Sequence, residues 1–206
     1  MTPKIVNKEA KRLEIMQAAI HVFAQNGIVK SKMIDIARKA GVGKGTIYEY
    51  FRSKEEIFAA AFDYFFNQIE ALIQQTLQIS VEPREQLKNL IRVTMEAFFK
   101  ESGDFLQIMM DFWAEGIRNK DDHLAEVINL KDVYRRYREI LTVIIEKGIA
   151  QGVFRPVNSV NMASFIIAAM DGLMLQWIME PDLFELEPVG DSLLDGLLNG
   201  LNKQDR

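Results

Sequence analysis

The chain contains no cysteine, and only two of its 206 residues are histidine. The absence of cysteine excludes disulfides, thiolate catalysis and cysteine-based zinc sites. His21 and His123 fall on different predicted elements, and no nucleophile–base pair or phosphate-binding loop accompanies them. The run Asp121-Asp122-His123 offers metal ligands, but without a second histidine nearby it is more typical of a solvated loop. We therefore expect no enzyme, no cofactor and no bound metal.

Targeting segments are also missing from the sequence. The basic residues near the start, from Lys4 to Arg12, are not followed by an uninterrupted apolar stretch, so we expect a cytoplasmic protein. Residues 158–179 are apolar enough to resemble a membrane span. Asp171 near the middle of that stretch makes membrane insertion costly, and no aromatic or basic girdle flanks it. We expect this segment to be a helix that packs against more than one neighbour.

Charge is distributed unevenly along the chain. The net charge is −4, yet residues 1–54 hold eleven Lys and Arg against four Asp and Glu, a balance of +7. The remainder, residues 55–206, carries −11. A basic head on an acidic body is typical of a protein that meets phosphates at one end only. Chance clustering of solvated charge is the alternative. The 49% apolar content is that of a globular protein with a core.

Residues 33–51, MIDIARKAGVGKGTIYEYF, are typical of two short helices joined at one glycine. Gly41 can supply the positive-φ residue of a tight corner. Ile36, Val42 and Ile47 would form part of the buried seam, and small Ala37 lets the helices cross closely. This spacing matches a DNA-reading helix-turn-helix, whose second helix enters the major groove. An ordinary αα-hairpin is the alternative interpretation.

The rest of the chain has helical periodicity throughout. Ser53 and Glu56 form a capping box that opens a helix of about 25 residues. We expect further helices over residues 9–25, 83–101, 105–117, 124–150, 158–180 and 190–202, with a loop from Pro181 to Pro188. The sequence thus predicts an all-α protein. Its parts are a three-helix DNA-binding domain over residues 1–54 and a larger helical effector-binding and dimerisation domain over residues 55–206.

Residues at the start of the presumed reading helix suit contact with DNA. Lys44 and Lys54 lie near helix N-termini, where a cation is unfavourable unless an anion approaches. Gly45 lets the backbone approach the groove wall. The hydroxyl of Thr46 can reach a phosphate or a base edge. Tyr48 faces outward, and Tyr50 can bury its ring while its hydroxyl reaches out. Solvated lysines are the alternative for the two cations.

The C-terminal helices suit the pairing of two chains. Small residues on one helix and a leucine stripe on the last helix predict a four-helix bundle between protomers. The predicted interface comprises Ala168, Ala169, Gly172, Leu193, Leu194, Leu197, Leu198 and Leu201. Packing of both helices within their own chain is the alternative.

Methionine and aromatic residues in the body can line an adaptable apolar effector pocket. The candidates are Met95, Phe98, Phe99, Phe105, Met109, Phe112, Trp113, Tyr134, Tyr137, Met170, Met174 and Trp177. Such residues more often form plain core. An inward carboxylate, such as that of Asp171, would favour a cationic or hydroxylated ligand.

The stretch from Ile15 to Ala61, which includes GVGKGTIYEYFRSKEEIF, resembles the tetracycline-repressor (TetR) family of bacterial transcriptional regulators. This resemblance implies an all-helical homodimer that binds operator DNA and a small effector. It places Lys44, Gly45, Thr46, Tyr48, Tyr50 and Lys54 at positions that commonly contact DNA. Gly43 and Lys32 depart from the family pattern, since a hydroxyl is frequent at both positions. Ser31 is then the expected cap and a candidate DNA contact.

The sequence therefore predicts a dimeric repressor, released from a palindromic operator by a small, largely apolar effector of unknown identity. The alternative is a DNA-associated protein of the same fold with no small-molecule switch, controlled by a partner or organising the chromosome. An enzyme is the third class, and the histidine pattern disfavours it.

Overall fold

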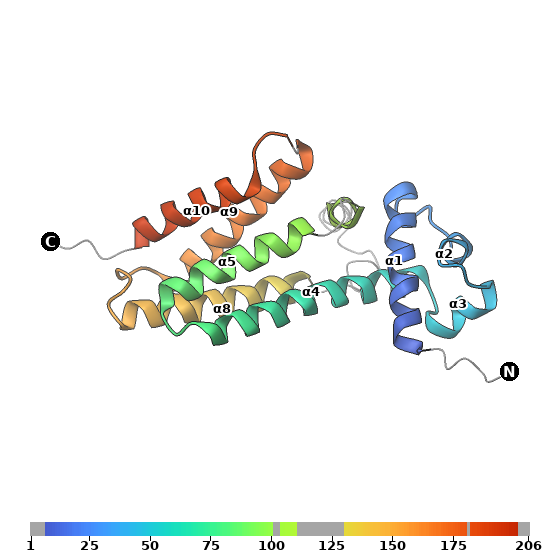
Figure 1. Cartoon of the computed structure of the whole chain (residues 1–206), viewed down its shortest axis with the longest axis horizontal. Coiled ribbons are helices and arrows are strands. Elements are labelled where there is room, and N and C mark those ends of the chain that lie inside the picture. Colours follow the sequence, from blue (N-terminus) through green and yellow to red (C-terminus); the bar gives the residue numbers. More distant parts are fainter. Residues whose placement is uncertain (1–6, 101–103, 111–129, 181, 202–206) are drawn as a thin grey trace. The chain divides into compact units, whose positions relative to one another are not determined.

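The computed structural model describes residues 7–100, 104–110, 130–180 and 182–201. Every regular element within these ranges is a helix, which confirms the all-α prediction. The helices are α1 (Lys8–Asn26), α2 (Met33–Lys39), α3 (Lys44–Tyr50), α4 (Lys54–Ile79), α5 (Pro83–Lys100), α8 (Leu130–Ala150), α9 (Ser159–Met179) and α10 (Leu186–Leu201), as Figure 1 shows. Residues 104–110 are also helical.

The chain divides into two compact units. The first unit contains residues 1–67 and 101–129, and the second contains residues 68–100 and 130–206. Helix α4 therefore gives its first half to one unit and its second half to the other. The sequence predicts a functional domain boundary after Lys54, and that boundary stays a prediction.

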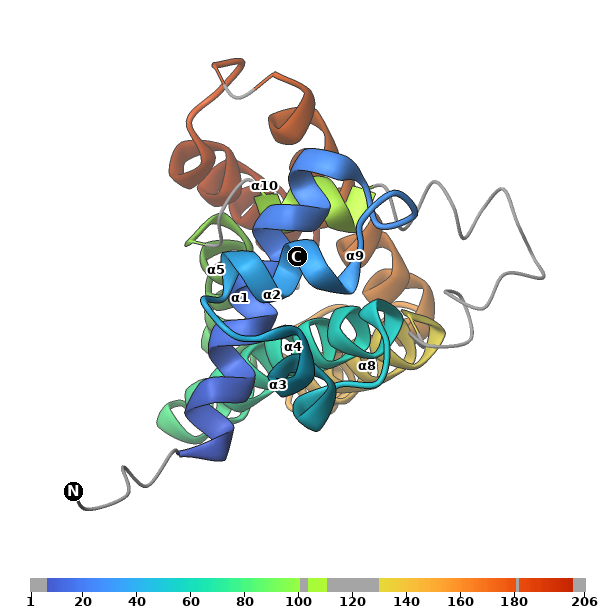
Figure 2. The same cartoon turned by 90° about the vertical axis from the view of Figure 1, so that its right-hand side faces the viewer.

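In the first unit, α1, α2 and α3 pack together around a small apolar core (Figures 1 and 2). The side chain of Asn7 accepts hydrogen bonds from the first amides of α1, and Gly27 ends that helix with a φ of 71°. Gly41 has a φ of 65° at the corner between α2 and α3, as its position in the sequence predicts. Ile36, Ala37 and Ile47 are fully buried at this corner.

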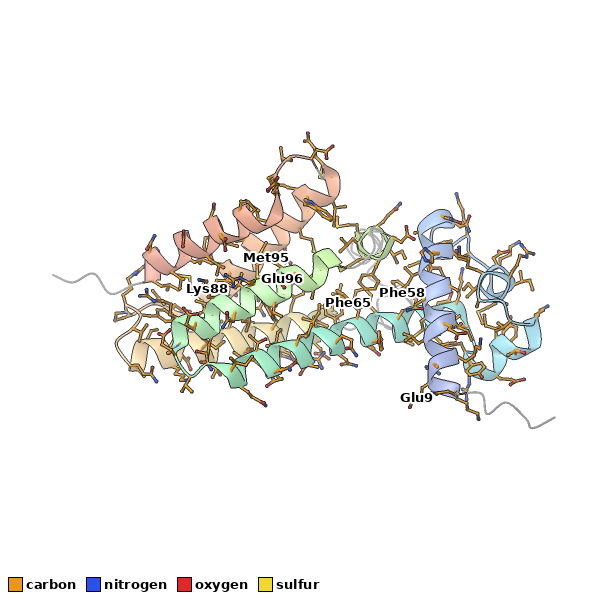
Figure 3. All side chains as sticks on the ribbon, viewed as in Figure 1. Glu9, Phe58, Phe65, Lys88, Met95 and Glu96 are labelled. Carbon is orange, nitrogen blue, oxygen red and sulfur yellow. The ribbon has the colours of Figure 1, made fainter. Side chains whose placement is uncertain are left out.

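The start of α4 is fixed by the predicted cap. The Ser53 hydroxyl accepts a hydrogen bond from the Glu56 amide at 3.1 Å. The Glu56 carboxylate accepts one from the Arg52 amide at 2.7 Å, one residue earlier than in an ideal capping box. The phenylalanines of α4 then form an aromatic cluster with α1 and with Phe105. Figure 3 labels two of them, Phe58 and Phe65.

In the second unit, α8 packs against α9, α5 packs against α8, and α10 packs against α5. Helices α8 and α9 run antiparallel, because Arg138 bonds to Ser164 while Tyr134 bonds to Asp171. The buried face of α9 consists of Ala163, Ile166, Ile167, Met170 and Met174. This helix is long and apolar enough to cross a membrane by length and composition alone. In the structure, 28% of its most apolar 18-residue window is buried.

The last helix begins earlier than the sequence analysis predicts. Residues 181–188 were expected to form a loop, whereas α10 already begins at Leu186. Pro188 falls in the first turn of α10, where the missing amide of proline would have had no helical partner, so the helix accommodates it. The segment predicted to be helical over residues 111–129 lies outside the described residues.

Candidate nucleic-acid interface and effector region

Helix α3 presents a polar face on the side opposite its buried residue. Ile47 is fully buried, whereas Lys44, Gly45 and Tyr48 are exposed. Thr46 is half-buried. Five of the predicted DNA-contact residues, including Tyr50, thus lie on one seven-residue helix, and three of them are open to solvent. The face combines a cation, a phenol and a glycine without a side chain, which suits contact with a phosphate backbone and base edges.

The N-terminus of α3 has no side-chain cap among the described residues. Gly43 occupies the cap position with extended backbone, so no hydroxyl bonds to the first amides of the helix. Those amides and the exposed Lys44 amine are all hydrogen-bond donors at the N-terminal end of α3. An incoming phosphate would satisfy both.

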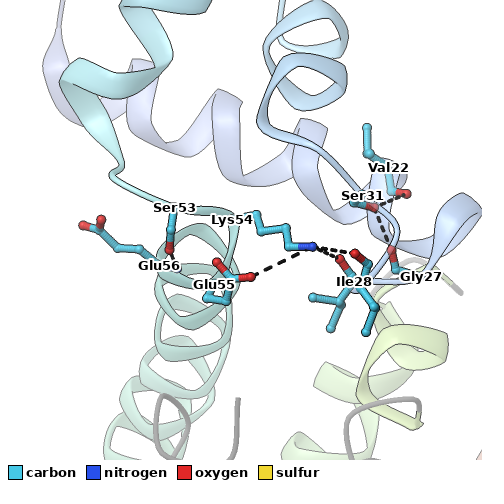
Figure 4. A network of polar contacts seen from close by, with 9 residues as sticks. Val22, Gly27, Ile28, Ser31, Ser53, Lys54, Glu55 and Glu56 are labelled. Atoms are coloured by element: carbon cyan, nitrogen blue, oxygen red, sulfur yellow. Dashed lines mark hydrogen bonds and ion pairs between the residues drawn. The ribbon is translucent and has the colours of Figure 1, made fainter. Parts of the chain in front are cut away.

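Lys54 does not extend freely into solvent. Its amine donates hydrogen bonds to the carbonyls of Ile28, at 2.8 Å, and Val29, at 2.7 Å, in the turn between α1 and α2 (Figure 4). Its nearest carboxylate oxygen, from Glu55, is 4.0 Å away. Backbone carbonyls thus already accept from this amine, and the contact of Lys54 with a phosphate stays a prediction. Lys54 holds the start of α4 against the turn after α1.

Ser31 is buried and serves the turn after α1. Its hydroxyl donates to the carbonyl of Gly27 at 2.7 Å and lies 3.3 Å from that of Val22 (Figure 4). The prediction that Ser31 caps α2 is wrong, since Lys32 occupies that cap position, and within the described residues no side chain caps it. Ser31 is 3% exposed, so it offers almost no surface to DNA in this conformation.

Arg12 was missed as a functional candidate by the sequence analysis. Its guanidinium on α1 donates a 3.0 Å hydrogen bond to the carbonyl of Tyr50 and lies 4.2 Å from the ring centre of Phe51. Tyr50 itself is half-buried at the end of α3. No local pattern signals this contact, because 38 residues separate Arg12 from Tyr50.

The second unit contains a chain of polar contacts within its apolar packing. Tyr134 donates to Asp171 at 3.0 Å, and Tyr137 donates to Thr94 at 3.1 Å. Thr94 in turn donates to the Leu90 carbonyl. Burial raises the pKa of Asp171 to about 6, although the bond from Tyr134 acts in the opposite direction. Burial also raises the pKa of both tyrosines above their usual range.

The predicted effector-pocket residues are divided between the two units. Met95, Met170 and Met174 are buried in the second unit. Phe98, Tyr134, Tyr137 and Trp177 are half-buried there. Figure 3 shows Met95 next to exposed Glu96 on α5.

Phe105 and Met109 are instead buried in the first unit, where the Phe105 ring centre lies 4.4 Å from that of Phe65. Phe112, Trp113, the side chain of Phe99 and the run from Asp121 to His123 lie outside the described residues. Within the described part of the chain, no group of three acidic or histidine side chains could hold a metal ion.

The predicted dimer residues also divide into two sets. Ala168 is exposed, and Ala169, Gly172, Leu193 and Leu198 are half-buried. Leu194, Leu197 and Leu201 are at most 6% exposed within the single chain, and their place in a dimer interface stays a prediction. The spacing of the leucines predicts an apolar face on α10, but it does not determine which neighbouring element covers each leucine.

An open groove of about 320 Å³ lies between α9 and α10. It is lined by Arg155, Met162, Phe165, Ser192, Leu193, Gly196, Leu197 and Gly200. Phe165 is 60% exposed beside it, which is unusual for a phenylalanine. The sequence does not single out Phe165, because α9 is apolar on nearly all sides and no polar face marks its outward side.

Comparison with known proteins finds family matches for both the head and the body of the chain. Residues 15–61 match the family described as "Bacterial regulatory proteins, tetR family". Residues 83–199, more than half of the chain, match the family described as "BetI-type transcriptional repressor, C-terminal". The chain belongs to the TetR family of bacterial transcriptional regulators.

Relatives of this TetR-family chain match it over more than nine-tenths of its length. The "Fatty acid metabolism regulator protein" of Bacillus subtilis is 28% identical and covers 96% of this chain and 98% of its own length. A structure of the regulator FadR from Bacillus subtilis, in complex with stearoyl-CoA, has a TM-score of 0.76 at 25% identity and covers 92% of this chain and 99% of its own. A transcriptional regulator from Saccharomonospora viridis, solved with choline, has the same fold, with a TM-score of 0.79 at 22% identity and coverage of 95% and 100%.

This membership confirms the predicted fold and class of function. The chain is a TetR-family transcriptional regulator with a C-terminal part of the repressor type, and its relatives are regulators of transcription, not enzymes. TetR-family regulators bind operator DNA and small-molecule ligands and act as dimers. The individual contact residues, the effector and the genes under control are not given by family membership.

Proposed function

We propose that this TetR-family chain is a cytoplasmic repressor that binds a palindromic operator as a homodimer through the exposed face of α3. The observation that carries the proposal is that Lys44, Gly45 and Tyr48 are open to solvent while Ile47 anchors the same helix in the core. A dimer would insert its two α3 helices into successive major grooves, roughly 34–36 Å apart or a multiple of that spacing. The basic head, residues 1–54, is the DNA-binding domain in this proposal, and residues 55–206 bind the effector and pair the chains.

The proposed effector is a largely apolar molecule, and a long-chain acyl thioester is the first candidate class. Support comes from the regulator of fatty acid metabolism that is 28% identical and from the FadR structure with stearoyl-CoA. Buried methionines such as Met170 and Met174 suit flexible alkyl chains, since methionine adapts to irregular apolar shapes.

A cationic effector is the second candidate class, and Asp171 favours it. Its half-buried carboxylate accepts a bond from Tyr134, and no cation pairs with it within the described part of the chain. A carboxylate next to phenol rings is a suitable environment for an alkylammonium group. The regulator solved with choline shares the fold. The two classes differ in charge, so one experiment separates them.

The test begins with selection of duplexes from a randomised DNA library by the purified wild-type protein. Binding of a labelled selected duplex is then followed by fluorescence anisotropy while stearoyl-CoA, free coenzyme A or choline is added. The proposal expects release by stearoyl-CoA and none by free coenzyme A at equal concentration. Release by choline and not by stearoyl-CoA would indicate that the effector belongs to the cationic class. Tight duplex binding that no ligand alters would favour the alternative of a regulator without a small-molecule switch.

A further inference from the structure

A single arginine joins the first helix of the head to the end of the reading helix. The Arg12 guanidinium on α1 donates to the Tyr50 carbonyl at 3.0 Å. The same group lies over the Phe51 ring at 4.2 Å from its centre. Phe51 is 1% exposed, and Arg12 is half-buried. Within the described residues this is the hydrogen bond that links α1 to α3.

The end of α3 needs such a partner. The helix has seven residues, too few to be stable without tertiary contacts. Its last carbonyls have no helical amide to accept from, apart from the Ile47 carbonyl, which accepts from Phe51. A cation at a helix C-terminus is favoured both by hydrogen bonding and by the helix dipole. Arg12 supplies that cation from another helix.

Gly41 and Arg12 control opposite ends of α3. The corner at Gly41, with its φ of 65°, fixes how α3 leaves α2. Arg12 then fixes where α3 ends, so the two contacts together define the direction of the helix axis. Lys44 and Tyr48 lie on the exposed side of this axis. A change in the direction of α3 would move both side chains relative to a groove.

Arginine suits this role better than lysine does. Its planar guanidinium can donate in its own plane to the Tyr50 carbonyl while its face lies on the Phe51 ring. A lysine amine is a compact, strongly hydrated charge and has no flat face to lie on the ring. Substitution by lysine therefore keeps the charge and loses the geometry.

We propose that Arg12 is a positioning residue for DNA recognition, which holds the C-terminal end of α3 at the angle that the operator requires. This inference rests on the proposed function, since it assumes that α3 reads DNA. Arg12 acts through Tyr50 and Phe51 and does not itself contact the phosphates. Its removal should weaken binding without changing the number of phosphate contacts.

The experiment compares Arg12→Lys and Arg12→Ala with the wild-type protein, using a labelled duplex that the wild type selects from a randomised library. Lys11→Ala is the matched control, because Lys11 is the next residue on α1 and its amine pairs with Glu14. Affinity is measured over a series of salt concentrations. Both Arg12 variants should bind about tenfold more weakly, because alanine loses the charge-assisted hydrogen bond to Tyr50 and lysine loses the flat contact with the Phe51 ring. Their salt dependence should remain that of the wild type.

Two outcomes of the binding measurements would overturn the inference. Wild-type affinity of Arg12→Lys would show that charge alone suffices. A salt slope that falls by about one in Arg12→Ala and recovers in Arg12→Lys would make Arg12 a phosphate contact.

Should Arg12→Ala fail to fold, hydrogen exchange of Arg12→Lys decides the matter. The inference expects faster exchange of the Phe51 amide with α2 unchanged, and unaltered exchange at Phe51 contradicts it. If the wild-type protein selects no duplex at all, the proposed function itself fails, and that result is distinct from normal binding by both variants.

Discussion

The phenol of Tyr134 on α8 donates a 3.0 Å hydrogen bond to the Asp171 carboxylate on α9. Burial keeps the pKa of Asp171 near 6, above its ordinary value of 3.8. In the unfolded chain the carboxyl group would titrate near the ordinary value. The native state therefore binds a proton between these two pH values that the unfolded state has already released.

Asp171→Asn should remove a pH dependence of stability. A raised native pKa gives a contribution that is fully present below pH 3.8 and is lost as the pH rises through about 6. Between about pH 5 and pH 7.5, the wild-type protein should lose about 1 kcal/mol more than the variant, allowing for partial solvent screening. Urea unfolding at both pH values measures the difference. Asp195→Asn on α10, an exposed carboxylate, is the control. Parallel pH profiles of the wild type and Asp171→Asn would contradict the prediction.

Gly45→Ala should make the protein more stable and a poorer DNA binder. A Cβ built at Gly45 meets no described atom within 4 Å, and the residue lies inside α3. Alanine should stabilise this helix by up to about 1 kcal/mol. The added methyl group would also lie between the backbone and the groove wall. Thermal unfolding and anisotropy with the selected duplex measure the two effects, and unchanged affinity would remove Gly45 from the interface.

Lys44→Ala and Lys54→Ala should have different effects. Lys44 is exposed at the start of α3, so its loss should weaken binding to every duplex and reduce the salt slope by about one. The Lys54 amine already donates to two backbone carbonyls. Its loss should lower the stability of the protein by about 1–3 kcal/mol. The salt slope of Lys54→Ala should change less than that of Lys44→Ala, and an equal reduction would restore Lys54 as a phosphate contact.

Local signals made the head predictable from the sequence. The corner glycine, the Ser53 cap and the apolar seam each depend on neighbouring residues, so Gly41 and Ile47 have the predicted conformation and burial. Contacts between distant residues were not predictable. Arg12 is 38 residues from Tyr50 and Lys54 is 26 residues from Ile28, and nothing in the local spacing of these residues indicates that they meet.

The body was less predictable because periodicity identifies an apolar face but not its neighbour. On α10, Leu194 and Leu197 follow the expected stripe but are buried within the chain. On α9, which is apolar around most of its circumference, no polar face marked the orientation of Phe165. Which methionine and aromatic residues line a pocket and which form plain core depends on tertiary packing, and residue spacing does not determine that packing.

Phe165→Glu should separate the two protomers. Phe165 is 60% exposed beside the groove between α9 and α10, the two helices predicted to pair the chains, so we expect a second chain to cover it. A buried glutamate with no partner in that interface would be costly. Val143→Glu is the matched control, because Val143 on α8 is 63% exposed and lies outside the groove. Sedimentation equilibrium should find Phe165→Glu monomeric and Val143→Glu dimeric. A stable Phe165→Glu dimer would place the interface elsewhere.

The central claim is that the exposed face of α3, presented twice by a dimer, recognises a specific duplex. The most direct measurement is the affinity of the wild-type protein for its selected duplex and for a shuffled duplex of equal composition, at several salt concentrations. We predict a preference for the selected duplex of about a thousandfold, with a stoichiometry of two chains and an affinity that falls steeply with salt. Equal affinity for both duplexes at every salt concentration would contradict the claim.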